Sequence, residues 1–189
     1  AWRRLKPSAA SLTSAATRHL PYPDQAFDLV VAVGVVEHLP AADRHRYVDE
    51  YYRVLKVGGY IGFFDSPNRY FPVETHSVGL PFVQWLPPEL AFLYAKLCRP
   101  RKFRGVNLPE FTRPGTGWRN ATYAECLPSS GMIELEDLTE IIGYCYQFFR
   151  DTARTWKRKA LMPLFSVLAG LAKRLGVPPS QCLPYLNLV

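Results

Sequence analysis

The chain has 189 residues, of which 48% are hydrophobic and 21% charged, so one globular domain with a buried core is expected rather than a disordered chain. Its net charge of +7 suits a polyanion or an anionic membrane, but no nucleic-acid-binding motif accompanies it, so no nucleic-acid partner is expected. The four cysteines lack metal-ligand or disulfide spacing, and no apolar run of about 18 residues occurs. We therefore expect a cytoplasmic chain with no metal site and no membrane-spanning helix.

The first predicted elements form a strand, a helix and a second strand. Two prolines hold the segment LPYPD, residues 20–24, extended. Residues 27–36 are almost continuously apolar and β-branched, which predicts a parallel strand covered on both faces. Apolar residues then recur three and four positions apart in a helix stopped by Gly58, and residues 60–67 form a second buried strand. This order predicts an α/β fold.

The remaining chain is less regular. Prolines interrupt an aromatic-rich stretch, residues 66–118, which suggests a lid or a substrate-facing insertion. The elements predicted within and after it are a helix at 88–98, a short helix at 121–127 capped by Asn120, a strand at 132–142, a helical stretch at 146–175 and a final strand at 183–189. The predicted organisation is one domain over 1–189, divided into a sheet core (8–66), a lid or substrate insertion (67–119) and C-terminal helices with the last strands (120–189).

Glu37 and His38 are the first candidates for chemistry. They follow the carboxyl end of the predicted central strand, where open α/β sheets bind their ligands. A purely structural role is equally compatible with the spacing, since Glu37 could cap the next helix and His38 could be a partly buried spacer.

Several spaced motifs resemble one known family. In chain order they are LPYPD at 20–24, FDLVVAVGVVEHL at 27–39, Glu50 with RVLKVGG at 53–59, and SPN at 66–68. Together they resemble the class I S-adenosylmethionine-dependent methyltransferases of the type 11 group. The resemblance is strong over about residues 10–70 and loose elsewhere.

The resemblance implies a Rossmann-like, mostly parallel sheet of seven strands, with the cofactor S-adenosyl-L-methionine across the carboxyl ends of the first four. It implies methyl transfer to a small-molecule acceptor. Glu37 and His38 match the pair that faces the transferred methyl group or the substrate. The positions matching the adenine and methionine contacts are Ala16, Thr17, Leu20, Ala32 and Val33, and those bordering the acceptor are Asn68, Arg69, Glu74 and His76.

Three departures from the family pattern matter. The glycine-rich turn after the first strand and the acid that ends the second strand have no counterpart in the sequence, and Val57 replaces the usual proline. A fragment that lacks the first strands, and is inactive by itself, is the simplest expectation. A degenerate domain that never bound the cofactor is the alternative.

The reaction itself requires few catalytic groups. A sulfonium methyl group passes to a nucleophile by in-line displacement, so alignment and exclusion of water contribute most. A hydroxyl or phenol acceptor must also lose a proton, for which His38 is the best general-base candidate and His76 the second. A loop histidine bonded to backbone is an equally good interpretation of His76.

A function without chemistry is the competing prediction. Residues 85–97 and 156–175 each combine apolar bulk with a basic cluster, as helices at a membrane surface do. The alternative function is therefore a basic, non-catalytic module with peripheral membrane contact through these two stretches. Packing of both apolar faces on the sheet would remove that contact, whereas an apolar or lipid-like acceptor would make the two functions compatible.

Overall fold

The fold is that of a computed structural model and is described for residues 18–130, 133–138, 163, 167 and 170–189. Its centre is a three-stranded sheet in the order β1 (Phe27–Val33), β2 (Leu55–Pro67) and β3 (Tyr185–Leu188). Strand β1 pairs with β2 in parallel, and β2 pairs with β3 antiparallel. The predicted α/β class, parallel first pair and final strand are confirmed.

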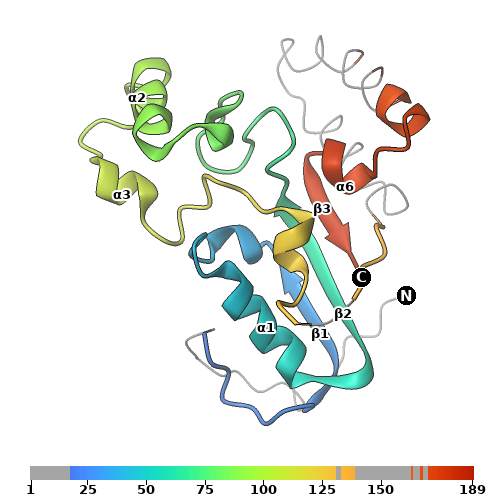
Figure 1. The fold of residues 1–189 in the computed structure, drawn as a ribbon. Helices are drawn as coiled ribbons and strands as arrows, with labels where there is room; N and C mark the ends of the chain where they lie inside the picture. The colour runs from blue at the N-terminus through green and yellow to red at the C-terminus, as the bar shows by residue number, and fades with distance from the viewer. Residues whose placement is uncertain (1–17, 131–132, 139–162, 164–166, 168–169) are drawn as a thin grey trace, which may run out of the picture.

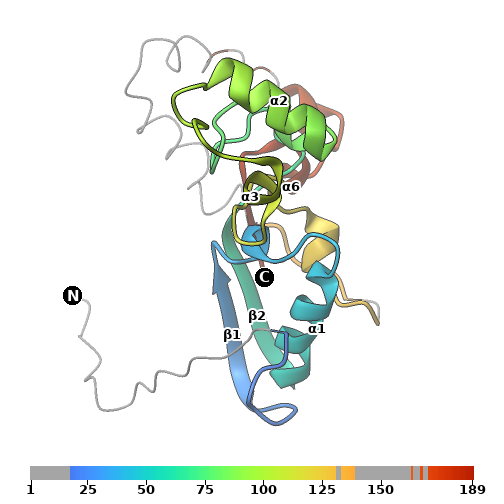
Figure 2. The ribbon, with the colours of Figure 1, turned by 90° about the vertical axis from the view of Figure 1, so that its left-hand side faces the viewer.

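Helix α1 (Arg44–Val54) covers one face of the sheet (Figure 2). Its Val48, Tyr51 and Val54 recur at helical spacing and are almost fully buried, as the periodicity predicts. The first two lie in a core with the inward-facing residues of β2, Ile61 and Phe63. The 3-10 helix η4 (Tyr123–Cys126) closes this core at its edge through the buried Cys126.

The opposite face of the sheet is open within the described residues. Leu29, Val31 and Val33 of β1 are 60%, 50% and 55% exposed. The prediction that this strand is covered on both faces is therefore wrong for the described structure, because α1 packs on one face only. The strand also ends at Val33 instead of residue 36, because Gly34 turns the chain with a φ of 59°.

Three other element boundaries differ from the prediction. Helix α1 ends at Val54, four residues before Gly58. Gly58 has a φ of 79° and lies inside β2, where residues 56–59 bulge out between the pairs Phe27–Leu55 and Leu29–Tyr60. The short helix η4 is capped by Thr122 and not by Asn120. Of the predicted strand at 132–142, the described residues 133–138 make backbone hydrogen bonds with Asn187 and Val189 and an isolated bridge between Asp137 and Leu188, and the other positions lie outside the described residues. Most of the predicted helix at 146–175 lies outside the described residues.

The segment 67–119 has a hydrophobic core of its own. It contains the 3-10 helix η3 (Val83–Trp85) and the helices α2 (Pro88–Cys98) and α3 (Leu108–Thr112), so the prediction of a helix at 88–98 is confirmed. The core residues are Val78, Leu80, Val83, Ala91, Ala95, Phe103, Phe111 and Trp118. Figures 1 and 2 place this segment over the carboxyl ends of β1 and β2.

Candidate functional site

The carboxyl end of β1 leads directly into the candidate site. After Gly34 the chain forms the 3-10 helix η2 (Val36–His38), which carries Glu37 and His38. The side chain of Glu37 is buried, and its Oε2 has no hydrogen-bond partner among the described residues. A buried carboxylate oxygen without a partner is costly in a purely structural position, so this atom marks a site that can take a ligand.

His38 is fixed by Gly115 through both backbone and ring. Its carbonyl accepts the Gly115 N–H at 3.0 Å, and its ring Nδ1 lies 2.7 Å from the Gly115 carbonyl oxygen. A carbonyl can only accept, so Nδ1 carries a proton, and in the neutral ring Nε2 is then the nitrogen with the lone pair. That Nε2 lies 3.7 Å from Oε1 of Glu37.

His76 joins this pair from the segment 67–119. Its ring lies edge-on to that of His38, with 4.8 Å between the ring centres. The ligand atoms of Glu37, His38 and His76 all lie within 4.8 Å of one another, and these are the residues at the site that could hold a metal ion. The cysteine and histidine spacing in the sequence gave no sign of this group, because His76 is brought in by the fold.

Asp65 is a neighbour that sequence reasoning missed. It lies near the end of β2 in a left-handed conformation, with a φ of 57°. Burial, together with the negative charge of Glu37, raises the pKa of Asp65. An acid in a strained conformation near the end of a central strand is typical of functional sites. Its position late in the second parallel strand, at the same sheet edge as Glu37, was the available signal.

A cavity of about 300 Å³ lies against Glu37. Leu39, Arg44 and residues 112–119 form most of its wall, and Pro88, the first residue of α2, also lines it. This volume is at the lower end of what small-molecule sites offer. The cavity is therefore large enough for a small molecule between Glu37 and the segment 67–119.

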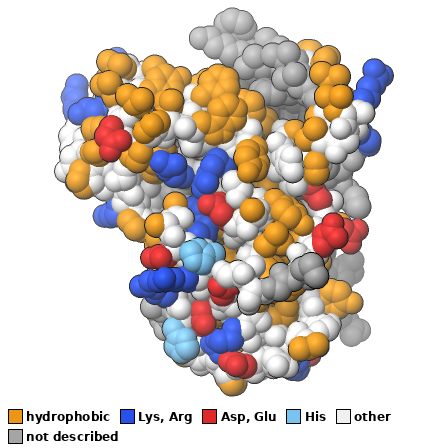
Figure 3. Space-filling model, in the orientation of Figure 1, with side chains coloured by type: hydrophobic (Ala, Val, Ile, Leu, Met, Phe, Trp, Pro, Cys, Tyr) orange, Lys and Arg blue, Asp and Glu red, His pale blue; other side chains and the backbone are white. Residues whose placement is uncertain are grey.

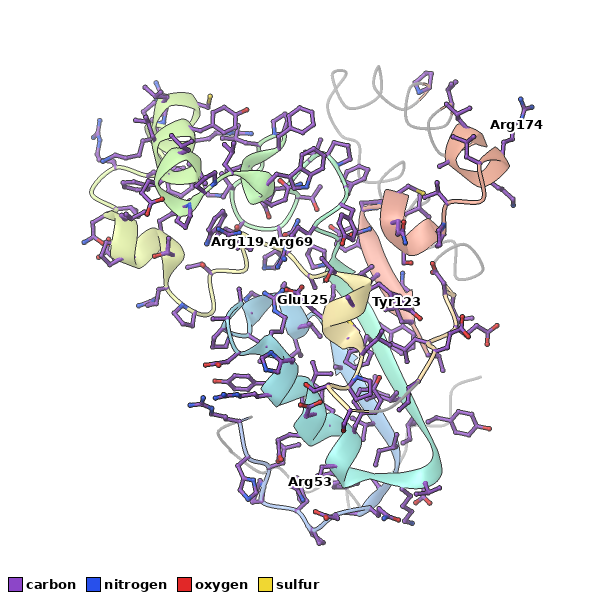
Figure 4. The ribbon with its side chains drawn as sticks, viewed as in Figure 1. Arg53, Arg69, Arg119, Tyr123, Glu125 and Arg174 are labelled. Atoms are coloured by element: carbon purple, nitrogen blue, oxygen red, sulfur yellow. The ribbon has the colours of Figure 1, made fainter. Side chains whose placement is uncertain are left out.

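Of the four predicted acceptor residues, only His76 lies beside His38. Asn68 is fully buried and donates to the carbonyls of Ser180 and Leu183 at 2.6 and 2.8 Å. Arg69 donates to the Arg119 carbonyl and to Glu125, as their positions in Figure 4 indicate. Both side chains hold the backbone of neighbouring segments together.

Glu74 is also fully buried, but it organises the loop that carries His76. Its two carboxylate oxygens accept four backbone N–H groups, those of His76, Ser77, Val78 and Gly79, at 2.5–2.8 Å. Glu74 therefore positions His76 from behind and does not itself face open space.

The predicted cofactor contacts are spread over the sheet. Ala32 is 5% exposed and packs in the core, whereas Val33 faces the open side at the carboxyl end of β1. The backbone of Leu20 is hydrogen-bonded to Glu50 and Arg53, which lie toward the C-terminal end of α1. Figure 4 shows Arg53 at the end of the sheet opposite to the segment 67–119, so the structure does not bring Leu20 together with Glu37. Ala16 and Thr17 lie outside the described residues.

A comparison with known families assigns the first third of the chain. Residues 1–63 match the family model described as "Methyltransferase domain". These residues are therefore similar to that family. The match includes β1, η2, α1 and most of β2, and so both Glu37 and His38. No curated protein and no solved structure matches the chain significantly.

The contact between His38 and His76 depends on Gly117. This residue has a φ of 70°, and a Cβ placed on it would lie 2.7 Å from Cδ2 of His76 and 3.3 Å from Cε1 of His38. The left-handed conformation alone disfavours a side chain by about 1–2 kcal/mol. At Gly117 a side chain is also opposed sterically, because its Cβ would collide with the ring of His76.

We expect Gly117→Ala to displace His76 from His38 and to lower the free energy of unfolding. The matched control is Gly105→Ala, because Gly105 has a φ of 77° but nothing within 4 Å of the position that a Cβ would take. Both variants should lose about 1–2 kcal/mol in urea unfolding from backbone strain. Only Gly117→Ala should change the NMR shifts of the two imidazole rings. Unchanged ring shifts in that variant would contradict the close contact.

Proposed function

We propose that the chain transfers a methyl group from S-adenosyl-L-methionine to a small-molecule acceptor at the Glu37–His38 end of β1. The observation that carries the proposal is the fixed imidazole of His38. Its Nδ1 is bound to Gly115, and its Nε2 lies with Glu37 and His76 beyond the carboxyl end of a strand in a methyltransferase domain. Parallel α/β sheets place their ligands at this edge.

His38 is proposed to receive the proton that a hydroxyl or phenol acceptor loses. The proton would move to the Nε2 lone pair, and the carboxylate of Glu37, 3.7 Å away, would stabilise the resulting positive ring. His76 would hold the acceptor against the ring of His38. S-Adenosylmethionine would supply the sulfonium methyl group. The surrounding wall would align the acceptor and exclude water, as in-line displacement requires.

The described residues fit part of the cofactor. Val33 is exposed and Gly34 has no side chain, so a ligand can approach the backbone at the carboxyl end of β1. Ala32 is buried, which leaves only its backbone for such a contact. We propose that Ala32 and Val33 lie beside the methionine moiety and that Ala16 and Thr17, with Leu20, lie toward the adenine.

The acceptor is proposed to be small, with an apolar or lipid-like part. The cavity beside Glu37 is about 300 Å³, and one wall consists of Leu39, Pro40, Ala41 and Ala42 together with Glu37 and Arg44. Its remaining wall belongs to the segment 67–119, which we propose to act as the lid of the site. A non-catalytic role at a membrane surface is compatible with the exposed side of that segment but would leave the Glu37–His38–His76 arrangement unexplained.

Replacing His38 with glutamine should lower methyl transfer by about 100-fold or more, because general-base catalysis typically contributes 10²–10⁴-fold. The measurement is release of S-adenosylhomocysteine with a panel of small hydroxylated and phenolic acceptors. Glutamine can still donate to the Gly115 carbonyl but offers no basic nitrogen. We expect the Kd for S-adenosylhomocysteine to stay unchanged, since the imidazole belongs to the acceptor side.

The matched control is His45→Gln, because His45 is exposed on α1 and outside the site. It should keep wild-type turnover. Equal turnover of His38→Gln and His45→Gln would remove His38 as the base. Absence of both S-adenosylhomocysteine binding and product release in the wild-type chain would contradict methyl transfer by these 189 residues alone and would agree with the expectation of a fragment that is inactive by itself.

A further inference from the structure

Helix α2 buries small residues and exposes large apolar ones, which is the reverse of what is expected for a helix in a closed globular domain. Its inward side carries the small residues Ala91 and Ala95, both fully buried. Leu90, Leu93 and Leu97 lie three and four positions apart on one stripe and are 53%, 54% and 71% exposed. A leucine left in water forgoes most of the stabilisation that its burial provides, so this stripe needs a partner.

Exposed aromatic side chains continue the apolar surface. Phe82 and Trp85 are 50% and 49% exposed, and their ring centres lie 5.1 Å apart. The indole N–H of Trp85 donates to the Arg69 carbonyl, so the ring is held in place. Aromatic rings with one polar end are favoured where a protein meets the boundary between lipid and water.

A one-sided charge accompanies this surface. Residues 90–109 contain five cationic side chains and no Asp or Glu: Lys96, Arg99, Arg101, Lys102 and Arg104. Among the described residues none of the five forms an ion pair with a carboxylate, whereas other surface arginines of the chain, such as Arg46, do. Figure 3 shows hydrophobic and basic side chains gathered in the part of the molecule that contains α2.

We propose that residues 82–104 form a docking surface for an anionic lipid bilayer. The apolar stripe of α2 would lie in the interface, and the cations next to it would contact lipid phosphates and carboxylates. A nucleic acid would satisfy the cations but leave the leucines in water. A bilayer satisfies both, and it suits the close succession of Lys96, Leu97 and Arg99 along the chain. No helix among the described residues is long and apolar enough to cross a membrane, so the contact is peripheral.

The proposal is tested by sedimentation of the purified chain with vesicles of phosphatidylcholine, with or without about 30% phosphatidylglycerol. We expect retention on the anionic vesicles and little on pure phosphatidylcholine. The variant Leu93→Ser/Leu97→Ser should weaken binding at least about tenfold. The variant Arg101→Gln/Lys102→Gln should weaken it by about 30-fold, since each basic residue contributes about fivefold.

Two control variants make the same chemical changes elsewhere. Val57→Ser removes an apolar side chain that is 89% exposed on β2, and Arg46→Gln removes an exposed cation on α1. Both should bind vesicles like the wild type. Absence of binding to anionic vesicles would overturn the proposal. Weaker binding of Arg101→Gln/Lys102→Gln with unchanged binding of Leu93→Ser/Leu97→Ser would also overturn it, because purely electrostatic binding would indicate a polyanion as the partner. The measurement needs neither donor nor acceptor, so its outcome is separate from that of the proposed function.

Discussion

Replacing Glu74 with glutamine should lower the free energy of unfolding by about 2–6 kcal/mol, because two N–H groups around its buried side chain would each lose an acceptor at a cost of about 1–3 kcal/mol. The two carboxylate oxygens together accept four backbone N–H groups from residues 76–79. A glutamine side chain keeps one oxygen but points its NH₂ group at two of those donors. Few side-chain changes as small as this one affect as many hydrogen bonds.

Urea unfolding followed by circular dichroism measures the loss, and hydrogen exchange locates it. The amides of His76, Ser77, Val78 and Gly79 should exchange slowly in the wild type and much faster in Glu74→Gln. Glu110→Gln is the matched control, because Glu110 is exposed in a capping box with Asn107 and glutamine can serve in the same role. A stability of Glu74→Gln within about 0.5 kcal/mol of that control would contradict the four-bond arrangement.

The consequence for the site follows from chain proximity. His76 comes two residues after Glu74, and its own N–H is one of the four that Glu74 holds. Loosening the loop should therefore separate His76 from His38 even where the rest of the fold survives. Glu74 thus affects the site without facing it, as a positioning residue.

The predictable part of this structure lies where the sequence pattern is local. The continuous apolar runs and the helical periodicity of residues 27–67 specify β1, α1 and β2, because neighbouring residues decide each element. The carboxyl end of β1 follows from the same pattern, so Glu37 and His38 could be identified from their place in the sequence. The final strand could also be predicted from its apolar residues, and β2 provides the sheet edge with which β3 pairs.

The unpredictable part depends on contacts between distant residues. His76 and Gly115 reach His38 only because the segment 67–119 folds back over the sheet. No local pattern distinguishes Glu74, which is bonded to backbone, from an acid that faces a ligand. The exposure of Leu29, Val31 and Val33 was missed because a continuous apolar run is typical of a strand covered on both faces, whereas α1 covers only one face of β1 in the described structure.

Arg44 is expected to give the second large effect, because it connects the site to the segment around η4. Its buried guanidinium donates to Asn120 O and Glu125 Oε2, both at 2.7 Å, and to the carbonyls of Glu37 and Leu39 at 3.2 and 3.3 Å. Burial lowers the pKa of Arg44, and the charge of Glu125 opposes that effect. These bonds fix the turn that carries Glu37 and His38.

Arg44→Met should lower the free energy of unfolding by about 3–5 kcal/mol, the usual cost of removing one partner from a buried ion pair. Arg44→Lys should fall between the wild type and Arg44→Met, because one ammonium cannot serve four acceptors in a fork geometry. Arg46→Met, on the exposed side of α1, is the control and should change stability little. Urea unfolding measures all three.

The double variant Arg44→Met/Glu125→Gln distinguishes an ion pair from independent contributions. If the two side chains act together, the loss in the double variant should be smaller than the sum of the single losses by about 1 kcal/mol or more. Glu125 keeps a second cation, since Arg69 donates to its Oε1 at 2.9 Å, and this limits how far the coupling can grow. Simple additivity would mean that Arg44 acts through the Glu37 and Leu39 carbonyls instead. In that case Arg44→Met should still reduce methyl transfer while Glu125→Gln does not, because only Arg44 holds the turn on which His38 sits.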